Sequence, residues 1–154
     1  MSTSIKEKSP FTQLVQIGVV VKDIDQAIER LSLLGIGPFY SKMPPPEAKS
    51  FYRGQPFSAA GRVIIKASRM GNVELELIQP VEGGSPHKEY LDAKGEGIQH
   101  IAFNVDDLGN EIKKLTTQGC TMLLDGRRDG GGVAYLDLNV GGIIVELIGR
   151  KSQP

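Results

Sequence analysis

The stretch QIGVVVKDIDQAIERLSLLG (16–35) recurs without a gap as HIAFNVDDLGNEIKKLTTQG (100–119). Each copy begins with a run rich in β-branched residues, which is typical of a strand. An aspartate follows where a helix would be capped, Asp23 in one copy and Asp107 in the other. Apolar residues then recur at helical spacing, and each copy ends in a glycine suited to a helix C-terminus. The repeat therefore predicts a strand and a helix in each half of the chain.

The remainder of each half matches as well. GNVELELI (71–78) corresponds to GGIIVELI (141–148), and RVIIKAS (62–68) and GVAYLDL (132–138) supply a preceding strand in each half. Both halves thus have the order strand, helix, strand, strand, strand. The sequence predicts an α+β fold built from two βαβββ modules in tandem.

The predicted boundaries follow from this repeat and from local composition. A flexible N-terminus (1–10) precedes a first module (11–80), which carries an insertion rich in proline and aromatics (40–57); a linker with a short helix (81–97), a second module (98–149) and a flexible tail (150–154) follow.

The amino-acid composition limits the kinds of partner and compartment that we expect for this protein. Eighteen basic and eighteen acidic residues give a formal net charge of zero, so no basic excess indicates a nucleic-acid partner. The single cysteine, Cys120, has no partner for an internal disulfide, which fits a reducing compartment. The first ten residues are polar, unlike a signal peptide, and no apolar run reaches the roughly 18 residues that span a bilayer. We expect a cytoplasmic protein without nucleic-acid or membrane partners.

Two pairs of polar residues occupy equivalent places in the repeat. Glu76 and Glu146 lie in the last strands, on the face opposite the one suited to packing under a helix. Gln16 and His100 open the first strand of each module. Taken singly, a strand glutamate on a solvated face or a structural histidine is the alternative interpretation. If the two sheets face one another, however, all four side chains converge, and such donors suit a divalent metal.

These motifs resemble the vicinal oxygen chelate superfamily, which includes glyoxalase I, methylmalonyl-CoA epimerase, bleomycin-resistance proteins and extradiol dioxygenases. The resemblance spans roughly 13–149 and rests on VQIGVVVKDIDQAIE (15–29), VELELIQP (73–80), GEGIQHIAFNVDDL (95–108) and GGIIVELI (141–148). It implies curved mixed sheets around a metal-centred cleft, commonly in homodimers. It also implies one divalent metal ion, Zn, Co, Ni or Mn, bound by Gln16, Glu76, His100 and Glu146.

Within the superfamily, the chain is most similar to the epimerase and to glyoxalase I. That similarity implies an isomerase, epimerase or lyase that transfers a proton next to a carbonyl of a small substrate. Ile64 aligns with the catalytic glutamate of the epimerase and cannot abstract a proton. Glu146 is therefore expected to act as the base, with Glu76 facing it.

Several cationic and aromatic residues are candidates for substrate binding. Arg127 and Arg128, in the turn DGRRDGGG (125–132), would bind a carboxylate or phosphate, unless the turn is only a solvated hairpin loop. Tyr52 in the insertion would wall the mouth of the cleft, or pack on the surface, and Lys66 lies two residues beyond Ile64.

Two other functions fit the same superfamily. A non-catalytic binding protein of the bleomycin-resistance kind would use the cleft without metal. A ring-cleaving dioxygenase typically requires two histidines and one carboxylate around Fe(II), and Gln16 argues against that chemistry.

Overall fold

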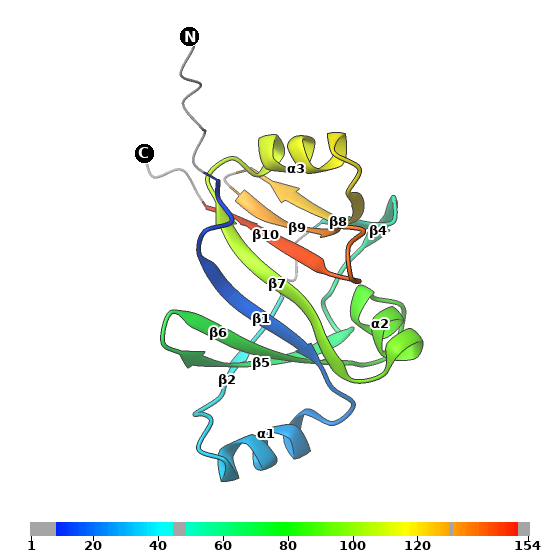
Figure 1. Ribbon diagram of the computed structural model, residues 1–154. Helices are drawn as coiled ribbons and strands as arrows, with labels where there is room; N and C mark the ends of the chain where they lie inside the picture. Colours follow the sequence, from blue (N-terminus) through cyan, green and yellow to red (C-terminus); the bar gives the residue numbers. More distant parts are fainter. Residues whose placement is uncertain (1–8, 45–48, 130, 151–154) are drawn as a thin grey trace.

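The computed structural model describes residues 9–44, 49–129 and 131–150, and the two βαβββ modules are evident in it (Figure 1). The first module contains β1 (Leu14–Val20), α1 (Ile24–Leu33), β2 (Tyr40–Lys42), β5 (Val63–Met70) and β6 (Val73–Pro80). The second contains β7 (Gly97–Val105), α3 (Leu108–Thr117), β8 (Thr121–Arg128), β9 (Gly131–Asp137) and β10 (Ile144–Gly149). The predicted α+β class and tandem modules are confirmed. Of the predicted flexible ends, residues 1–8 and 151–154 lie outside the described residues.

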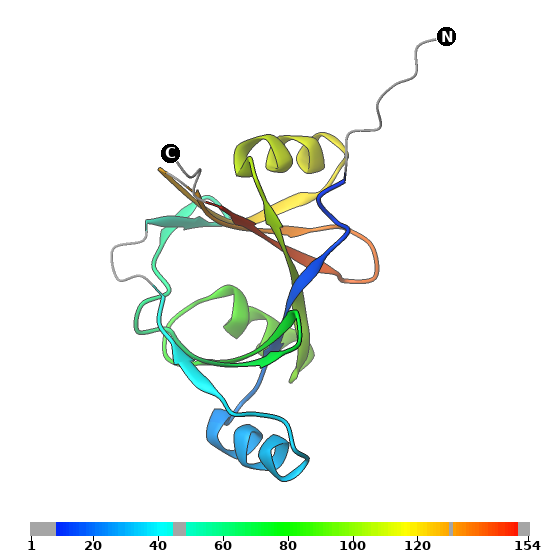
Figure 2. The ribbon, with the colours of Figure 1, turned by 90° about the vertical axis from the view of Figure 1, so that its left-hand side faces the viewer.

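The two modules share one ten-stranded mixed sheet in the order β2-β5-β6-β1-β7-β10-β9-β8-β3-β4. Each opening strand pairs in parallel with the last strand of its own module, β1 with β6 and β7 with β10. The two opening strands pair with each other in antiparallel fashion, which joins the modules. The sheet is curved, and α1 and α3 lie on its outer side (Figure 2).

The segment predicted as an insertion contributes strands to both ends of this sheet. Its first residues form β2, which pairs with β5. Its last residues form the hairpin of β3 (Ser50–Tyr52) and β4 (Gln55–Phe57), and β3 pairs with β8 of the second module. A hairpin inserted in the first module therefore pairs with β8, the outermost strand that the second module itself contributes to the sheet.

Each module helix begins at the aspartate that the repeat identified. The carboxylate of Asp23 accepts a hydrogen bond from the backbone N–H of Gln26, and that of Asp107 accepts one from Asn110. These side chains satisfy amide groups that a helix start leaves without partners.

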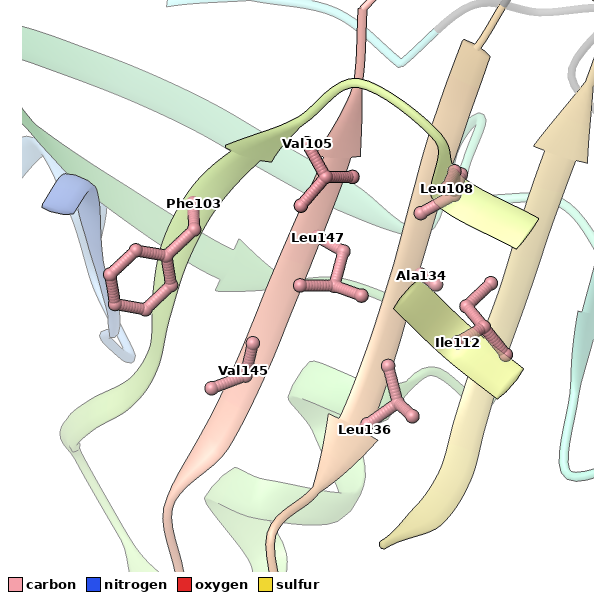
Figure 3. Close-up of a cluster of buried hydrophobic side chains, with 8 residues drawn as sticks. All are labelled: Phe103, Val105, Leu108, Ile112, Ala134, Leu136, Val145 and Leu147. Carbon is pink, nitrogen blue, oxygen red and sulfur yellow. The ribbon is translucent and has the colours of Figure 1, made fainter. Parts of the chain in front are cut away.

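The outer face of the sheet packs against these helices. Leu108 and Ile112 of α3 lie on Val145 and Leu147 of β10 and their neighbours, a buried cluster shown in Figure 3. In the first module, Ile24 of α1 packs on Leu77 of β6. Because side chains alternate along a strand, the residues between these apolar positions face inward.

A third helix, α2 (Pro86–Lys94), lies between the modules and contacts β1, β6 and β7. Ser85 caps it by accepting a hydrogen bond from the backbone N–H of Lys88. Within the described residues, no helix combines the length and apolar character needed to cross a membrane.

Candidate functional site

Four adjacent strands in the middle of the sheet bring the predicted polar side chains together on the inner face. Glu76 comes from β6, Gln16 from β1, His100 from β7 and Glu146 from β10. All four are buried, and all belong to one chain. The structure thus brings together the four residues that the repeat singled out.

Gly18 provides the space that His100 occupies. The two residues are partners in the β1–β7 register. A Cβ atom on Gly18 would lie 2.0 Å from Cε1 and 2.3 Å from Nε2 of His100. The imidazole therefore lies over Gly18, where β1 has no side chain. Sequence reasoning missed this role, although a glycine inside a β-branched run signals a close approach.

A hydrogen-bonded network holds Glu76. The Gln16 side-chain Nε2 donates to Glu74 Oε1 at 2.9 Å and to Glu76 Oε2 at 3.1 Å. Lys42 Nζ donates to the same two oxygens, at 2.7 and 2.6 Å. The hydroxyl of Tyr40 donates to the other oxygen of Glu74. Glu76 is thus fixed through Oε2, and its Oε1 remains 3.9 Å from His100 Nε2.

These contacts set the charges of the network. Burial opposes ionisation of Glu74, but hydrogen bonds from Lys42, Tyr40 and Gln16 outweigh it and lower the pKa of Glu74. Burial also opposes the charge of Lys42, yet the two carboxylates raise its pKa. Burial, followed by the charge of Glu146, raises the pKa of Glu76 despite the opposing effect of Lys42.

Sequence reasoning did not find Lys42 or Tyr40. Both lie in the segment that was treated as an insertion, where no repeat partner marks them. Their spacing of two residues was the available signal, since it puts both side chains on one face of β2.

Two side-chain oxygen atoms converge on Nε2 of His100, a nitrogen that can carry at most one hydrogen. Its Nε2 lies 3.0 Å from Gln16 Oε1 and 3.1 Å from Glu146 Oε2. The second contact lacks the geometry of a hydrogen bond, and Glu146 Oε2 is buried with no hydrogen-bond partner among the described residues. Burying such an oxygen without a partner is costly, and a bound cation would offset that cost.

The donor types fit a divalent metal ion. One imidazole nitrogen, two carboxylates and an amide oxygen suit several first-row divalent metals. The ammonium of Lys42 pairs with both Glu74 and Glu76. Glu146 instead contacts the imidazole of His100 and would pair with a further cation. The described side chains contain no group of three or more His, Cys, Asp or Glu residues close enough to hold an ion. Glu76 Oε2 bonds to Lys42, and Glu76 Oε1 lies 3.9 Å from His100 Nε2.

A cavity of about 190 Å³ opens above Glu76 and Glu146. Most of its wall is apolar, and its other polar members are Ser50, His87, Arg128 and Tyr135. Burial, then the charges of Glu146 and Glu76, raise the pKa of Tyr135 well above its usual value, so its hydroxyl stays protonated. A larger depression of about 420 Å³ lies between residues 9–15 and the start of α3 and touches none of the four central residues.

The two arginines of the β8–β9 hairpin point in different directions. Arg128 lines the cavity. Arg127 is turned away and forms an ion pair with Asp125, with Nη2 and Oδ2 2.6 Å apart. The structure therefore leaves Arg128 as the cavity-facing member of the predicted pair.

The other predicted substrate residues lie outside this cavity. Lys66 is on the outer side of β5 and forms an ion pair of 3.2 Å with Asp25 of α1. Tyr52 packs edge-on against Phe57 and borders a shallow depression beside α2.

Strand β5 presents apolar side chains to the cavity. Val63 and Ile65 line it, whereas Ile64 points outward and is 41% exposed. Strand β5 is where the alignment with an epimerase would put the catalytic glutamate. It has no carboxylate on either face.

His87 is a cavity residue that sequence reasoning did not single out, and it lies in α2, within the predicted linker. Its Nδ1 lies 2.7 Å from Gln99 Oε1, and its ring contacts that of Tyr135. Burial, together with the charge of His100, lowers the pKa of His87 to about 4. The imidazole is therefore neutral near pH 7.

Comparisons with known proteins agree with this architecture. The chain is 30% identical over 136 residues to the uncharacterized protein YqjC of Bacillus subtilis, an alignment that covers 80% of this chain and 94% of that protein. A hypothetical protein of Bacillus halodurans superposes with a TM-score of 0.67 at 23% identity, covering 92% of this chain and 96% of that one. Methylmalonyl-CoA epimerase from Mycobacterium tuberculosis superposes with a TM-score of 0.63 at 24% identity, covering 96% and 92%.

A further structural relative is the Streptomyces coelicolor methylmalonyl-CoA epimerase in complex with 2-nitronate-propionyl-CoA. One of its variants superposes with a TM-score of 0.68 at 21% identity, covering 93% of this chain and 99% of that one. These likenesses show a shared fold. The sequence model of the glyoxalase/bleomycin resistance protein/dioxygenase superfamily matches residues 15–135. With two βαβββ modules curved around a polar centre, the chain belongs to the glyoxalase/bleomycin resistance protein/dioxygenase superfamily.

Proposed function

We propose that this protein is a divalent-metal-dependent isomerase, epimerase or lyase that transfers a proton next to a carbonyl of a small substrate. The observation that carries this proposal is the buried oxygen of Glu146, which faces His100 Nε2 at the floor of the cavity without a hydrogen bond. In the proposal, Gln16, Glu76, His100 and Glu146 hold the metal. When bound, the ion would act as a Lewis acid on the substrate carbonyl.

The carboxylates of Glu76 and Glu146 differ in how firmly hydrogen bonds hold them, which suggests different roles. Glu76 is held through Oε2 by Lys42 and Gln16 and can turn little. Glu146 has an oxygen with no hydrogen bond among the described residues, so it can move toward the substrate. We therefore assign proton abstraction to Glu146 and a fixed, charge-balancing role to Glu76. Strand β5 supplies no competing base.

Acyl-CoA thioesters are the first substrates to test. The Streptomyces coelicolor epimerase with this fold is in complex with 2-nitronate-propionyl-CoA, and another methylmalonyl-CoA epimerase is in complex with methylmalonyl-CoA. In this chain the apolar wall would take a short acyl group, and Arg128 is suited to bind a carboxylate or phosphate. We propose that the protein acts as a homodimer in the cytoplasm.

Metal binding is the first test. The protein is purified without added metal, analysed by mass spectrometry of the elements, and titrated with Zn²⁺, Co²⁺, Ni²⁺ and Mn²⁺ by calorimetry. We expect one ion per chain and loss of binding in His100→Leu. Wild-type protein that neither retains nor takes up any of these ions would overturn the proposal.

Proton transfer is the second test. Metal-loaded protein is incubated with methylmalonyl-CoA in D₂O, and deuterium uptake at the carbon between the carbonyls is followed by mass spectrometry. Glu146→Gln should slow exchange by about 10²-fold or more, the usual contribution of a positioned base. Glu89→Gln, which removes an exposed carboxylate paired with Arg53, is the matched control. Full exchange by Glu146→Gln would refute its role as base.

A non-catalytic binding protein is the second candidate, favoured by the apolar inner face of β5. It predicts that metal-free protein binds the acyl-CoA as tightly as metal-loaded protein and exchanges no deuterium. The two tests above separate these functions.

A further inference from the structure

We propose that Gln99 is a positioning residue whose amide oxygen holds a hydrogen on Nδ1 of both His87 and His100 and so fixes the orientation of both imidazoles. The consequence for metal binding rests on the proposed metal site, whereas the positions of these two hydrogens do not. Gln99 belongs to β7 and is buried beside α2.

The orientation of the Gln99 amide follows from its contact with a backbone carbonyl. Its Nε2 donates to the carbonyl oxygen of Pro86 at 3.1 Å. A carbonyl oxygen can only accept, so the amide nitrogen must face Pro86 and the amide oxygen must face the other way. That oxygen lies 2.7 Å from His87 Nδ1 and 3.1 Å from His100 Nδ1. Because it carries no hydrogen, both imidazoles must donate to it through Nδ1–H.

For His100, this hydrogen bond turns Nε2 toward the place where the oxygens of Gln16 and Glu146 converge. Gln16 Nε2 donates to two carboxylates, so Gln16 Oε1 is an acceptor for His100 Nε2 as well. An ion bound to Nε2 would take the place of a hydrogen there, whereas the hydrogen on Nδ1 would remain. Gln99 therefore fixes the side of the ring that a bound ion would leave protonated. Such an outer partner commonly sets the ring orientation and tautomer of a metal-binding histidine.

For His87, the same oxygen leaves an unprotonated Nε2 at the cavity wall. No described residue forms a hydrogen bond with this atom, and His87 lines the cavity. Since the buried ring is neutral, its Nε2 is an acceptor for a hydroxyl or N–H group of a bound compound. One amide thus sets the chemistry of two imidazoles, one facing the metal site and one facing the substrate.

The tautomers can be measured directly in metal-free protein. Long-range ¹H–¹⁵N correlation spectra of ¹⁵N-labelled wild type should show a hydrogen on Nδ1 of both imidazoles. Gln99→Leu removes the acceptor oxygen, so both rings should shift toward the Nε2–H form. Zn²⁺ affinity should fall by about 10- to 100-fold, the usual effect of losing an outer partner of a metal ligand.

Two further variants separate positioning from a general effect on folding. Gln99→Glu keeps an acceptor oxygen and should retain both tautomers. Gln79→Leu removes a different amide oxygen, one that accepts from the backbone N–H of Ile24, and should leave tautomers and Zn²⁺ affinity unchanged.

The inference is overturned if either wild-type imidazole lacks a hydrogen on Nδ1, a result that needs no variant to fold. It is also overturned if Gln99→Leu keeps both Nδ1–H tautomers, or if Gln79→Leu shifts them equally. A wild type that binds no Zn²⁺ but shows these tautomers would overturn the proposed function alone.

Discussion

The missing side chain of Gly18 determines where His100 can lie. Gly18→Ala would bring a Cβ within 2.0–2.5 Å of three ring atoms, so the imidazole must move. We expect a loss of about 1–3 kcal/mol in the free energy of unfolding, as for other overpacked sites. Weaker Zn²⁺ binding should accompany it. Gly84→Ala is the control, because a Cβ there meets nothing within 4 Å. Chemical denaturation and calorimetry of both variants check this; equal behaviour would contradict it.

The buried imidazole of His87 makes stability depend on pH. Its pKa falls from an ordinary 6.5 to about 4 on folding. Between these values the unfolded chain binds more protons than the folded one, so stability rises with pH. The contribution of His87 is complete above about pH 6.5 and is lost as pH falls through about 4.

Replacement of this residue should remove that dependence. The free energy of unfolding of His87→Phe should fall less steeply than that of wild type between about pH 7 and about pH 4.5. The difference in the fall should be on the order of a few kcal/mol. Urea denaturation at both pH values measures it. Parallel curves for the two proteins would show that burial does not shift this pKa.

Repeat symmetry reveals only residues that have partners in both modules. It identified Gln16 with His100 and Glu76 with Glu146, and the structure brings these four to one face. Lys42 and Gln99 have no such marker, because their contacts form only in the folded chain. The direction of Arg127 depends on its pairing with Asp125, which the sequence spacing alone leaves undecided.

At the scale of single elements, both module helices depend on their capping aspartates. Asp107→Ala should lower the free energy of unfolding by about 1 kcal/mol, because the N–H of Asn110 loses its acceptor. Asp106→Ala changes an exposed neighbour that is not the N-cap and should have little effect. Thermal and urea unfolding of the two variants provide the comparison. A similar loss in both would indicate that charge near the helix, rather than the cap, matters.

Elements with a strong local pattern were predictable, and short elements were not. Caps and apolar spacing identified α1 and α3, and alternating apolar residues identified β6 and β10. Strands β3 and β4 have three residues each, too few for a pattern of their own. Their extended form depends on pairing with each other and with β8, some 70 residues away in the chain.

For the whole molecule, the arrangement of strands predicts that one chain completes each site. Glu76 and Glu146 come from strands of the same chain, separated only by β1 and β7. If Glu76→Gln and Glu146→Gln are unfolded together, mixed and refolded, no metal-binding site should be restored. Exchange of modules between chains would instead regenerate one intact site in each mixed dimer. Zn²⁺ titration of the mixture, with each variant alone as control, distinguishes the two.

The position of β10 also bears on how the protein is made. This strand carries Glu146 and leaves the ribosome after β7 and β9, yet it inserts between them. Until β10 emerges, the edges of β7 and β9 that it will pair with have no partner strand. A nascent chain therefore lacks one of the four side chains of the proposed site until β10 has emerged. Ion binding at that site can begin only after β10 has paired with both of its neighbours.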